Sequence, residues 1–137
     1  MGAVSRSGYS DDLETWALIC WRGAVKKAIT GSRGQALLRE MLIALDAMPA
    51  KRLISRDLIK EGEVCALGAV AAARGLDVSA VDPEDRDTVA GVFNIAPALA
   101  AEIVYENDET WTGETPEERY ARMREWVAAN LKQEVSE

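Results

Sequence analysis

The 137-residue sequence contains no histidine and only two cysteines, Cys20 and Cys65. Without histidine, a chain cannot form a Ser–His or Cys–His nucleophile pair, and it cannot bind zinc or haem through imidazole. Two cysteines are also fewer than the four protein ligands of a usual structural zinc site. We therefore expect no metal, no cofactor and no enzymatic activity.

Long apolar runs and phosphate-binding loops are missing as well. No stretch approaches the ~20 apolar residues that cross a bilayer. The glycine-containing segment 29–35 has the wrong spacing, and lacks the lysine, of a nucleotide-binding loop. Both cysteines lie within apolar runs, which favours buried thiols in a reducing compartment over a disulfide framework. These features predict a cytoplasmic protein without membrane contact.

Hydrophobic residues make up 48% of the chain and charged residues 28%, which is typical of a globular protein. The length fits one domain, and we expect a flexible arm over residues 1–9 followed by a single helical domain over residues 10–137. The net charge of −7 is unevenly distributed. Basic residues concentrate in 22–60 and acidic residues in 61–118, although folding need not keep the two groups apart in space.

The segment EGEVCALGAVAAARG, residues 61–75, predicts the centre of the fold. It carries no charged side chain between positions 64 and 73, and a short helix that is apolar on every face must be surrounded by other helices. Gly75 after Arg74 predicts its end. We expect a mainly α, single-domain bundle of about six helices around a central helix over residues 64–74.

Capping residues and hydrophobic periodicity predict the remaining elements. A proline at the first helical position and Glu118 at the third make Thr115 the start of a capping box. The other expected elements are a helix from Ser10 or Asp11 to about Ile29, a helix over 34–48, a minor hairpin over about 52–64, a helix capped by Asp82 and ending at Phe93, and a helix from Pro97.

Periodicity also predicts which side chains face the core. Steps of 100° along the first helix place one apolar set on a single face: Leu13, Trp16, Ala17, Cys20, Ala24 and Ala28. We interpret Trp16, Trp21 and Trp126 as core residues. In the last helix, Glu118 and Arg122 have the spacing of an i, i+4 ion pair.

Acidic residues between positions 102 and 118 form the first candidate site. They could perform acid–base chemistry, bind a divalent cation, remain solvated, or occupy the basic groove of a partner in the manner of nucleic acid phosphates. Trp111 lies within this polar stretch, where an exposed indole would anchor a partner. The predicted protein-binding set is Glu102, Glu106, Asp108, Glu109, Trp111 and Glu114.

The alternative sites are basic residues and one thiol. Arg22, Lys26, Lys27 and Arg33 could follow a nucleic-acid backbone, but a pI of about 4.7 and the lack of interleaved aromatics argue against this function. Cys65 lies near the start of the central helix, where a thiolate would be stabilised. Its apolar neighbours favour a buried, inert thiol instead.

Four segments resemble a group of small uncharacterised proteins of tailed bacteriophages and prophages. They are WRGAVKKAITGSRGQALLREMLIALDAMPAKRLI (21–54), EGEVCALGAV (61–70), IAPALAAEIVYENDE (95–109) and ETPEERYARMREWV (114–127). The resemblance extends from about residue 5 to residue 132 and brings no established function or catalytic residue. It implies a phage-encoded protein that is made inside a bacterial cell.

Three functions are therefore compatible with the sequence. The first is a non-enzymatic protein that binds a host or phage protein through its acidic surface and modulates host machinery or antagonises host defence. The second is a nucleic-acid-binding accessory or regulator, and the third is an enzyme that depends on Cys65 or on carboxylates. A homodimer through the wide apolar face of the first helix is a further expectation.

Overall fold

The computed structural model describes residues 9–108 and 113–132, and these residues form six helices and one two-stranded antiparallel hairpin. The mainly α fold with a minor hairpin confirms the prediction from sequence. Residues 1–8 of the expected arm lie outside the described residues, and Tyr9 already belongs to the first helix. The elements are α1 (Tyr9–Thr30), α2 (Ser32–Ala47), β1 (Ile59–Lys60), β2 (Glu63–Val64), α3 (Ala66–Arg74), α4 (Arg86–Phe93), α5 (Pro97–Asp108) and α6 (Pro116–Asn130).

Helix α3 packs on α2 and α5, as its apolar sequence predicts. Its N-cap is Cys65, whose Sγ accepts a hydrogen bond from the Gly68 backbone N–H at 3.4 Å, and it ends at Gly75 with φ of 73°. Residues 66–71 are buried, but Ala72 and Ala73 are exposed. Burial on every face is therefore confirmed for the first two turns and wrong for the last, which α2 and α5 do not cover.

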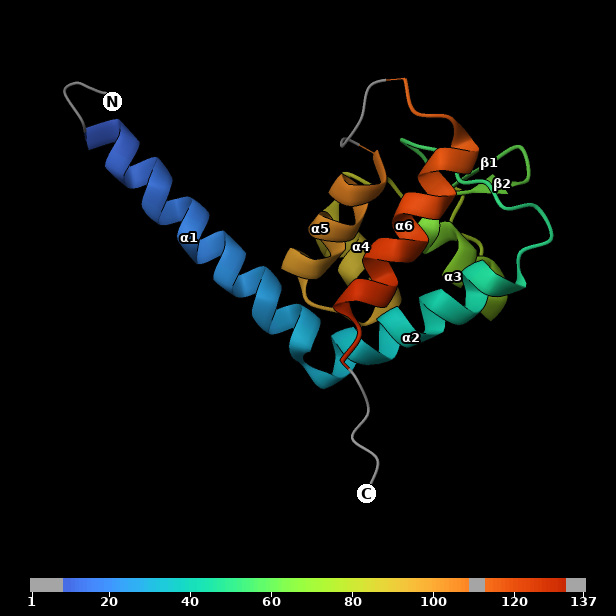
Figure 1. The fold of residues 1–137 in the computed structure, drawn as a ribbon, viewed down its shortest axis with the longest axis horizontal. Helices are drawn as coiled ribbons and strands as arrows, with labels where there is room; N and C mark the ends of the chain where they lie inside the picture. Colours follow the sequence, from blue (N-terminus) through green and yellow to red (C-terminus); the bar gives the residue numbers. More distant parts are fainter. Residues whose placement is uncertain (1–8, 109–112, 133–137) are drawn as a thin grey trace.

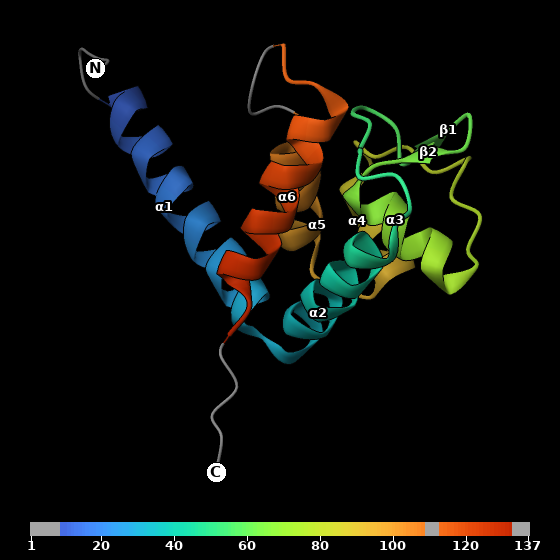
Figure 2. The same cartoon turned by 45° about the vertical axis from the view of Figure 1, so that its right-hand side comes forward.

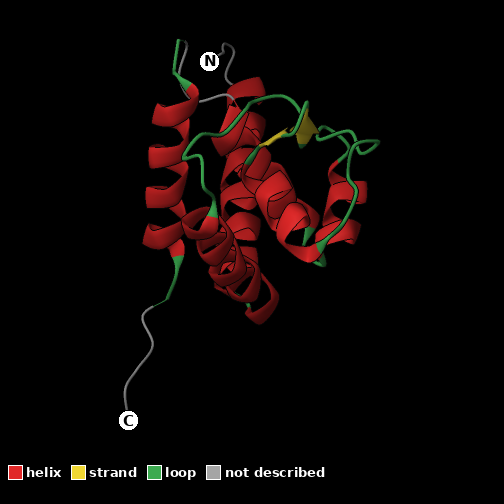
Figure 3. Ribbon diagram, turned by 90° about the vertical axis from the view of Figure 1, so that its right-hand side faces the viewer, coloured by secondary structure: helices red, strands yellow, loops and turns green. Residues whose placement is uncertain are grey.

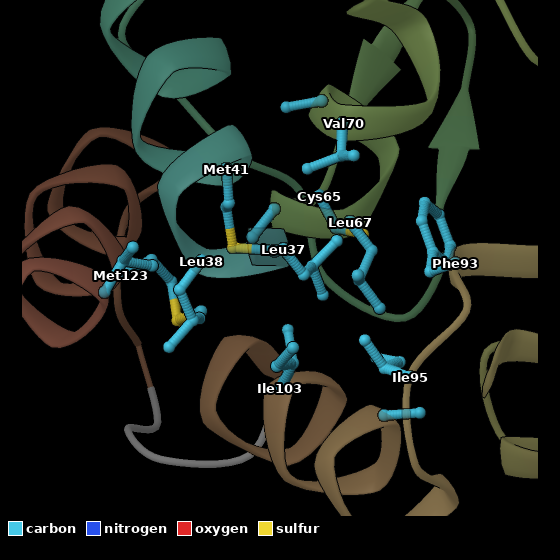
Figure 4. Packing of buried hydrophobic residues seen from close by; sticks show 14 of the residues in the cluster. Leu37, Leu38, Met41, Cys65, Leu67, Val70, Phe93, Ile95, Ile103 and Met123 are labelled. Atoms are coloured by element: carbon cyan, nitrogen blue, oxygen red, sulfur yellow. The ribbon is translucent and has the colours of Figure 1, made fainter. Parts of the chain in front are cut away.

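The core lies where α2, α3, α5 and α6 meet. Figure 4 shows Met41 and Leu38 of α2 between Leu67 of α3 and Met123 of α6, with Ile103 of α5 beneath them. All five side chains have exposed fractions of 1% or less. Burial of a leucine- or methionine-sized side chain contributes about 2 kcal/mol, so this layer holds the four helices together.

The hairpin and its loops lie at the end of the bundle away from the C-terminal end of α6 (Figure 3). Its register pairs Ile59 with Val64 and Lys60 with Glu63. The connecting residues Glu61 and Gly62 both have positive φ, 53° and 81°, as a two-residue turn matched to the strand twist requires. The predicted hairpin within 52–64 is confirmed.

Gly68 allows the chain that enters this hairpin to cross α3 closely. A Cβ atom on Gly68 would overlap the backbone carbonyl oxygen of Leu58. That carbonyl accepts a hydrogen bond from the Cys65 backbone N–H at 3.0 Å. The small residue in the central helix therefore serves the close approach of the chain around the hairpin, at Leu58 and Val64.

The prediction for the start of α4 is wrong by three residues. Asp85, rather than Asp82, is the N-cap: its carboxylate accepts the Thr88 backbone N–H at 3.2 Å and the Thr88 hydroxyl at 2.8 Å. Asp82 instead accepts the Glu84 N–H within the preceding turn. Either aspartate could cap a helix, but Asp85 is favoured because Thr88 offers it a hydroxyl donor in addition to the backbone N–H. The predicted end at Phe93 is confirmed.

The start of α6 is confirmed in detail, since Thr115 and Glu118 form both hydrogen bonds of the capping box. The expected contact between Glu118 and Arg122 is wrong. Glu118 turns back to the Thr115 N–H at 2.9 Å, whereas Arg122 binds Glu114 and the Glu106 carbonyl. The capping box therefore uses the Glu118 carboxylate, and the more buried Glu114 carboxylate binds Arg122, so the surface ion pair does not form.

Helix α1 spans the predicted residues, but its predicted inner face is wrong. Trp16 is 64% exposed, and Ala17, Cys20 and Ala24 are exposed too. Val25 and Ile29 form the buried contact with the bundle, with Trp21 and Ala28 half-buried. Figures 1 and 2 show the first half of α1 extending away from α2–α6. The tryptophan prediction therefore fails for Trp16, while Trp21 and Trp126 pack against the core.

Candidate interaction surface

The acidic residues on α5 differ in their surroundings. Glu102 and Glu106 lie one turn apart and are both half-buried. Burial, and then the neighbouring Glu106 charge, raises the pKa of Glu102 above its ordinary value. Asp108 accepts a hydrogen bond from the Asn107 side-chain amide at 2.7 Å. Glu109 and Trp111, also predicted as binding residues, lie outside the described residues.

Glu114 is held inside the molecule by arginines of α6. Its carboxylate receives Nε and Nη2 of Arg122 at 2.6 and 2.9 Å, and Nε of Arg119 lies 3.5 Å away. Only 7% of the Glu114 side chain is exposed. The hydrogen bond from Arg122 lowers the pKa of Glu114, against the opposing effect of burial. Its charge is thus neutralised within the chain and little of it reaches solvent.

Asn107 is a structural residue that the sequence analysis missed. Its amide donates to the Ile54 carbonyl at 2.9 Å and accepts the Ala66 N–H at 3.2 Å, and the residue is 1% exposed. Position 107 continues the inward stripe of α5 through Ala100 and Ile103, at spacings of three and four. That spacing was the available signal, because a polar residue on an apolar stripe is buried with partners.

The four predicted basic residues separate into two pairs. Arg22 and Lys26 line a cleft on one side of α1. Lys27 and Arg33 line a hollow on another side, beside the start of α5, and Arg33 donates to the Asn94 side chain at 3.3 Å. Arg22 and Lys26 therefore line one concavity, and Lys27 and Arg33 line another.

The cleft that holds Arg22 and Lys26 has a volume of about 520 Å³. It opens between α1 and the end of α6, and its lining includes Trp21, Val25, Ile29 and Leu131. Glu102 lines the same cleft. The structure therefore brings together one residue from the acidic set and two from the basic set, which the sequence analysis had assigned to different surfaces.

A buried amide fixes the base of this cleft. Gln35 of α2 donates to the Ile29 carbonyl at 2.8 Å and to the Asn130 carbonyl at 3.0 Å, and it accepts the Lys132 N–H at 2.8 Å. The end of α1 and the end of α6 are thus joined through one side chain. The guanidinium of Arg86 lies 5.6 Å from the centre of the Trp21 ring, a distance that suits a cation–π contact.

The N-terminal half of α1 also presents large apolar side chains to solvent. Trp16, Leu18 and Ile19 are 64%, 47% and 53% exposed. The other large exposed apolar residues of the described chain are Ile43 on α2, Leu76 in the segment after α3 and Tyr105 on α5. Leu18 and Ile19 are not among the predicted binding residues, because the predicted buried face of α1 lies on the wrong side of the helix.

The two cysteines have opposite environments. Cys65 is buried, and burial raises its pKa to about 12 despite the hydrogen bond from Gly68. Such a thiol is protonated at neutral pH and does not act as a nucleophile. Cys20 is exposed on α1, which corrects its assignment to the buried face.

Among residues 9–108 and 113–132, no group of three or more Cys, Asp or Glu side chains could hold a metal ion. No single helix in these ranges is long and apolar enough to cross a membrane. The pair α4 and α5, which is bent by 105° at the break between the two helices, passes the same test by length and composition together. No protein family, curated protein or solved structure matches the chain.

Proposed function

We propose that this chain is a non-enzymatic interaction protein of the bacterial cytoplasm that binds a host or phage protein through the cleft beside α1. The observation that carries the proposal is the apolar cleft along Trp21, Val25 and Ile29, with Leu18 exposed next to it on the same helix. The resemblance to phage and prophage proteins supports a partner of phage or host origin.

The first half of α1 stands clear of the bundle (Figure 1). A short helix that packs on nothing is marginally stable in water, and contiguous exposed apolar surface marks interaction sites. Leu18, Trp21 and Val25 lie at spacings of three and four residues, so they follow one stripe of the helix. An amphipathic helix of the partner, laid along this stripe, would cover Leu18 and the exposed part of Trp21 next to the buried Val25.

The charges at the rim define the chemistry of that partner. Arg22, Lys26 and Lys132 line the cleft together with Glu102. A partner helix with an apolar face and acidic flanking residues complements this rim, and such complementarity raises the association rate and gives specificity. The acidic residues of α5 thus contribute Glu102 to the proposed site, while Glu114 stays in its internal ion pair.

A non-enzymatic role agrees with the chemistry of the described residues. The chain has no histidine, Cys65 is held as a protonated thiol, and the carboxylate of Glu114 is neutralised by Arg122. Nucleic-acid binding is the alternative function. It would require a continuous basic footprint, whereas Lys27 and Arg33 lie on a different side of α1 from Arg22 and Lys26.

The test is a pulldown with tagged full-length protein from lysate of infected host cells. Leu18→Glu places a charge on the proposed stripe, and Ile43→Glu is the matched control on α2, where Ile43 is 70% exposed. We expect the wild type and Ile43→Glu to retain the same protein and Leu18→Glu to lose it at least tenfold, with unchanged helical circular dichroism. Retention by all three, or by none, would overturn the proposal.

A further inference from the structure

Glu102 is a half-buried carboxylate of the cleft that has no ion pair or side-chain hydrogen bond within the described part of the chain. Glu106, one turn further along α5, differs, because Nη1 of Arg122 lies 3.7 Å from its carboxylate. Arg122 also binds Glu114 at two points. The arginine of α6 therefore neutralises the two neighbouring glutamates and leaves the charge of Glu102 uncompensated among residues 9–108 and 113–132.

The hydroxyl and the amide side chain that line this cleft are engaged elsewhere. Oγ1 of Thr30 donates to the Lys26 carbonyl at 2.9 Å, and Nδ2 of Asn130 donates to the Trp126 carbonyl at 2.8 Å. Each of these hydrogen bonds closes within one helix, α1 or α6. A carboxylate that loses water needs hydrogen-bond donors in its place. Neither side chain is free to supply one to Glu102 when a partner covers the cleft.

The basic residues of the cleft do not pair with Glu102 either. They are Arg22 and Lys26, one turn apart on α1, and Lys132 after α6. In the described structure none of the three forms an ion pair with Glu102. Burial, followed by the charge of Glu106, raises the pKa of Glu102, whereas a cation in contact with the carboxylate would lower it. The carboxylate and the bases therefore face a ligand as separate charges.

We propose that the partner helix carries a lysine or arginine beside its apolar stripe, and that this cation pairs with Glu102 in the complex. The inference rests on the proposed function and specifies the chemistry of the partner at the same cleft. A partner that covers Glu102 removes its remaining water, and a carboxylate buried without an ionic partner weakens binding. A basic side chain on the partner supplies the donor that the cleft lacks in its described residues.

The partner helix therefore carries charges of both signs. Acidic residues on it complement the three bases, and one basic residue complements Glu102. This mixed pattern selects the direction and the rotation with which the helix lies along α1, because a helix in the wrong orientation places like charges together. A surface of one sign, such as the phosphates of a nucleic acid, pairs with the bases but is repelled by Glu102.

The first experiment uses small probes that reproduce the alkyl body and the cation of such a side chain. n-Hexylamine and 1-hexanol are titrated into the full chain, and the indole N–H signal of Trp21, which lines the cleft, is followed by NMR spectroscopy. Glu125→Gln is the matched control for Glu102→Gln, because Glu125 is exposed on α6 and is not among the residues that line the cleft.

We expect n-hexylamine to bind Glu102→Gln about tenfold more weakly than it binds the wild type or Glu125→Gln. 1-Hexanol, which has the same alkyl body without the charge, should bind all three proteins equally. Equal affinity of the amine for the wild type and Glu102→Gln would overturn the proposal, and so would a wild type that binds the amine no more tightly than the alcohol.

The second experiment adds Glu102→Gln and Glu125→Gln to the pulldown with Leu18→Glu. Glu102→Gln should retain about tenfold less of the protein that the wild type retains, and Glu125→Gln should retain the same amount. A loss in Leu18→Glu without a loss in Glu102→Gln would refute this inference and leave the proposed function in place. No loss in Leu18→Glu would refute the proposed function, and the inference about its partner would fail with it.

Discussion

The guanidinium of Arg122 binds the carboxylate of Glu114 at two points, with N–O distances of 2.6 and 2.9 Å. Nη1 of the same arginine donates to the Glu106 carbonyl at 2.6 Å. One side chain of α6 therefore binds the C-terminal part of α5 and the residue just before the cap of α6. Two-point contacts between arginine and carboxylate are among the stronger hydrogen-bonded pairs in proteins.

Loss of this arginine should destabilise the fold. Arg122→Ala leaves the Glu114 carboxylate largely buried and without its main partner, and such a change costs about 3 kcal/mol. We expect the urea midpoint to fall accordingly in equilibrium unfolding followed by circular dichroism.

The matched control for that variant is Arg124→Ala, which breaks a two-point contact with Asp46 at the surface of the same helix. Exposed pairs contribute little to stability, so this variant should unfold close to the wild type. Equal losses in the two variants would contradict the importance assigned to burial at Glu114.

Glu102 should make stability depend on pH in the opposite sense to Glu114. Its pKa is raised above the ordinary value of 4.5 by burial and then by Glu106, so the folded state binds the proton more tightly than the unfolded state. The free energy of unfolding therefore falls as pH rises from 4.5 through the folded pKa. Glu102→Gln should be more stable than the wild type at neutral pH, and the difference should vanish below 4.5.

Glu114→Gln provides the opposite sign for comparison. Its folded pKa is lowered, mainly by Arg122, so its contribution to stability is present above the ordinary value of 4.5 and is lost as pH falls through the folded pKa. The variant should be less stable than the wild type at neutral pH and approach it in acid. Parallel curves for the two glutamine variants would refute the assigned environments.

The two thiols should differ sharply in reactivity. Cys20 is exposed, whereas Cys65 is buried with its pKa raised to about 12. Ellman's reagent should therefore modify one thiol per native chain rapidly and the second only when urea is added. In Cys20→Ser the rapid phase should disappear, and its persistence would place Cys65 in contact with solvent.

Gly68 should tolerate no side chain. A Cβ there overlaps the carbonyl oxygen of Leu58, so Gly68→Ala has to displace the backbone before the hairpin, at a cost of about 3 kcal/mol. Gly91→Ala is the matched change at a helical site without neighbours, and it should gain up to about 1 kcal/mol from helix propensity. Thermal unfolding of both variants measures the contrast.

Much of the fold was predictable because its signals are local. The capping box at Thr115 and the left-handed stop at Gly75 each depend on a few adjacent residues, and both are present as expected. The buried face of α1 was not predictable in this way. Apolar residues surround α1 on all sides, so the neighbouring helices decide which of them become buried, and periodicity within the helix carries no information about that choice.

The candidate site shows the same limit. Sequence placed Glu114 in an acidic surface, but Arg122 neutralises it from eight positions further along. Glu102 and Lys26 line one cleft although 76 residues separate them in the chain. Contacts of this kind form only after α1, α5 and α6 have packed, and no local pattern encodes them.

The hydrogen bonds of Gln35 help to fix the orientation of α1 relative to the other helices. A helix joined to the rest of the chain only by the single residue Gly31 could change its orientation freely. Here the C-terminal end of α1 is hydrogen-bonded through Gln35 to α2 and to the end of α6. A partner protein that binds along the first half of α1 is consequently held at a fixed angle to the bundle and at a fixed distance from it. The orientation of the first half of α1 is therefore set by the Gln35 amide together with the packing of Val25 and Ile29 on the bundle.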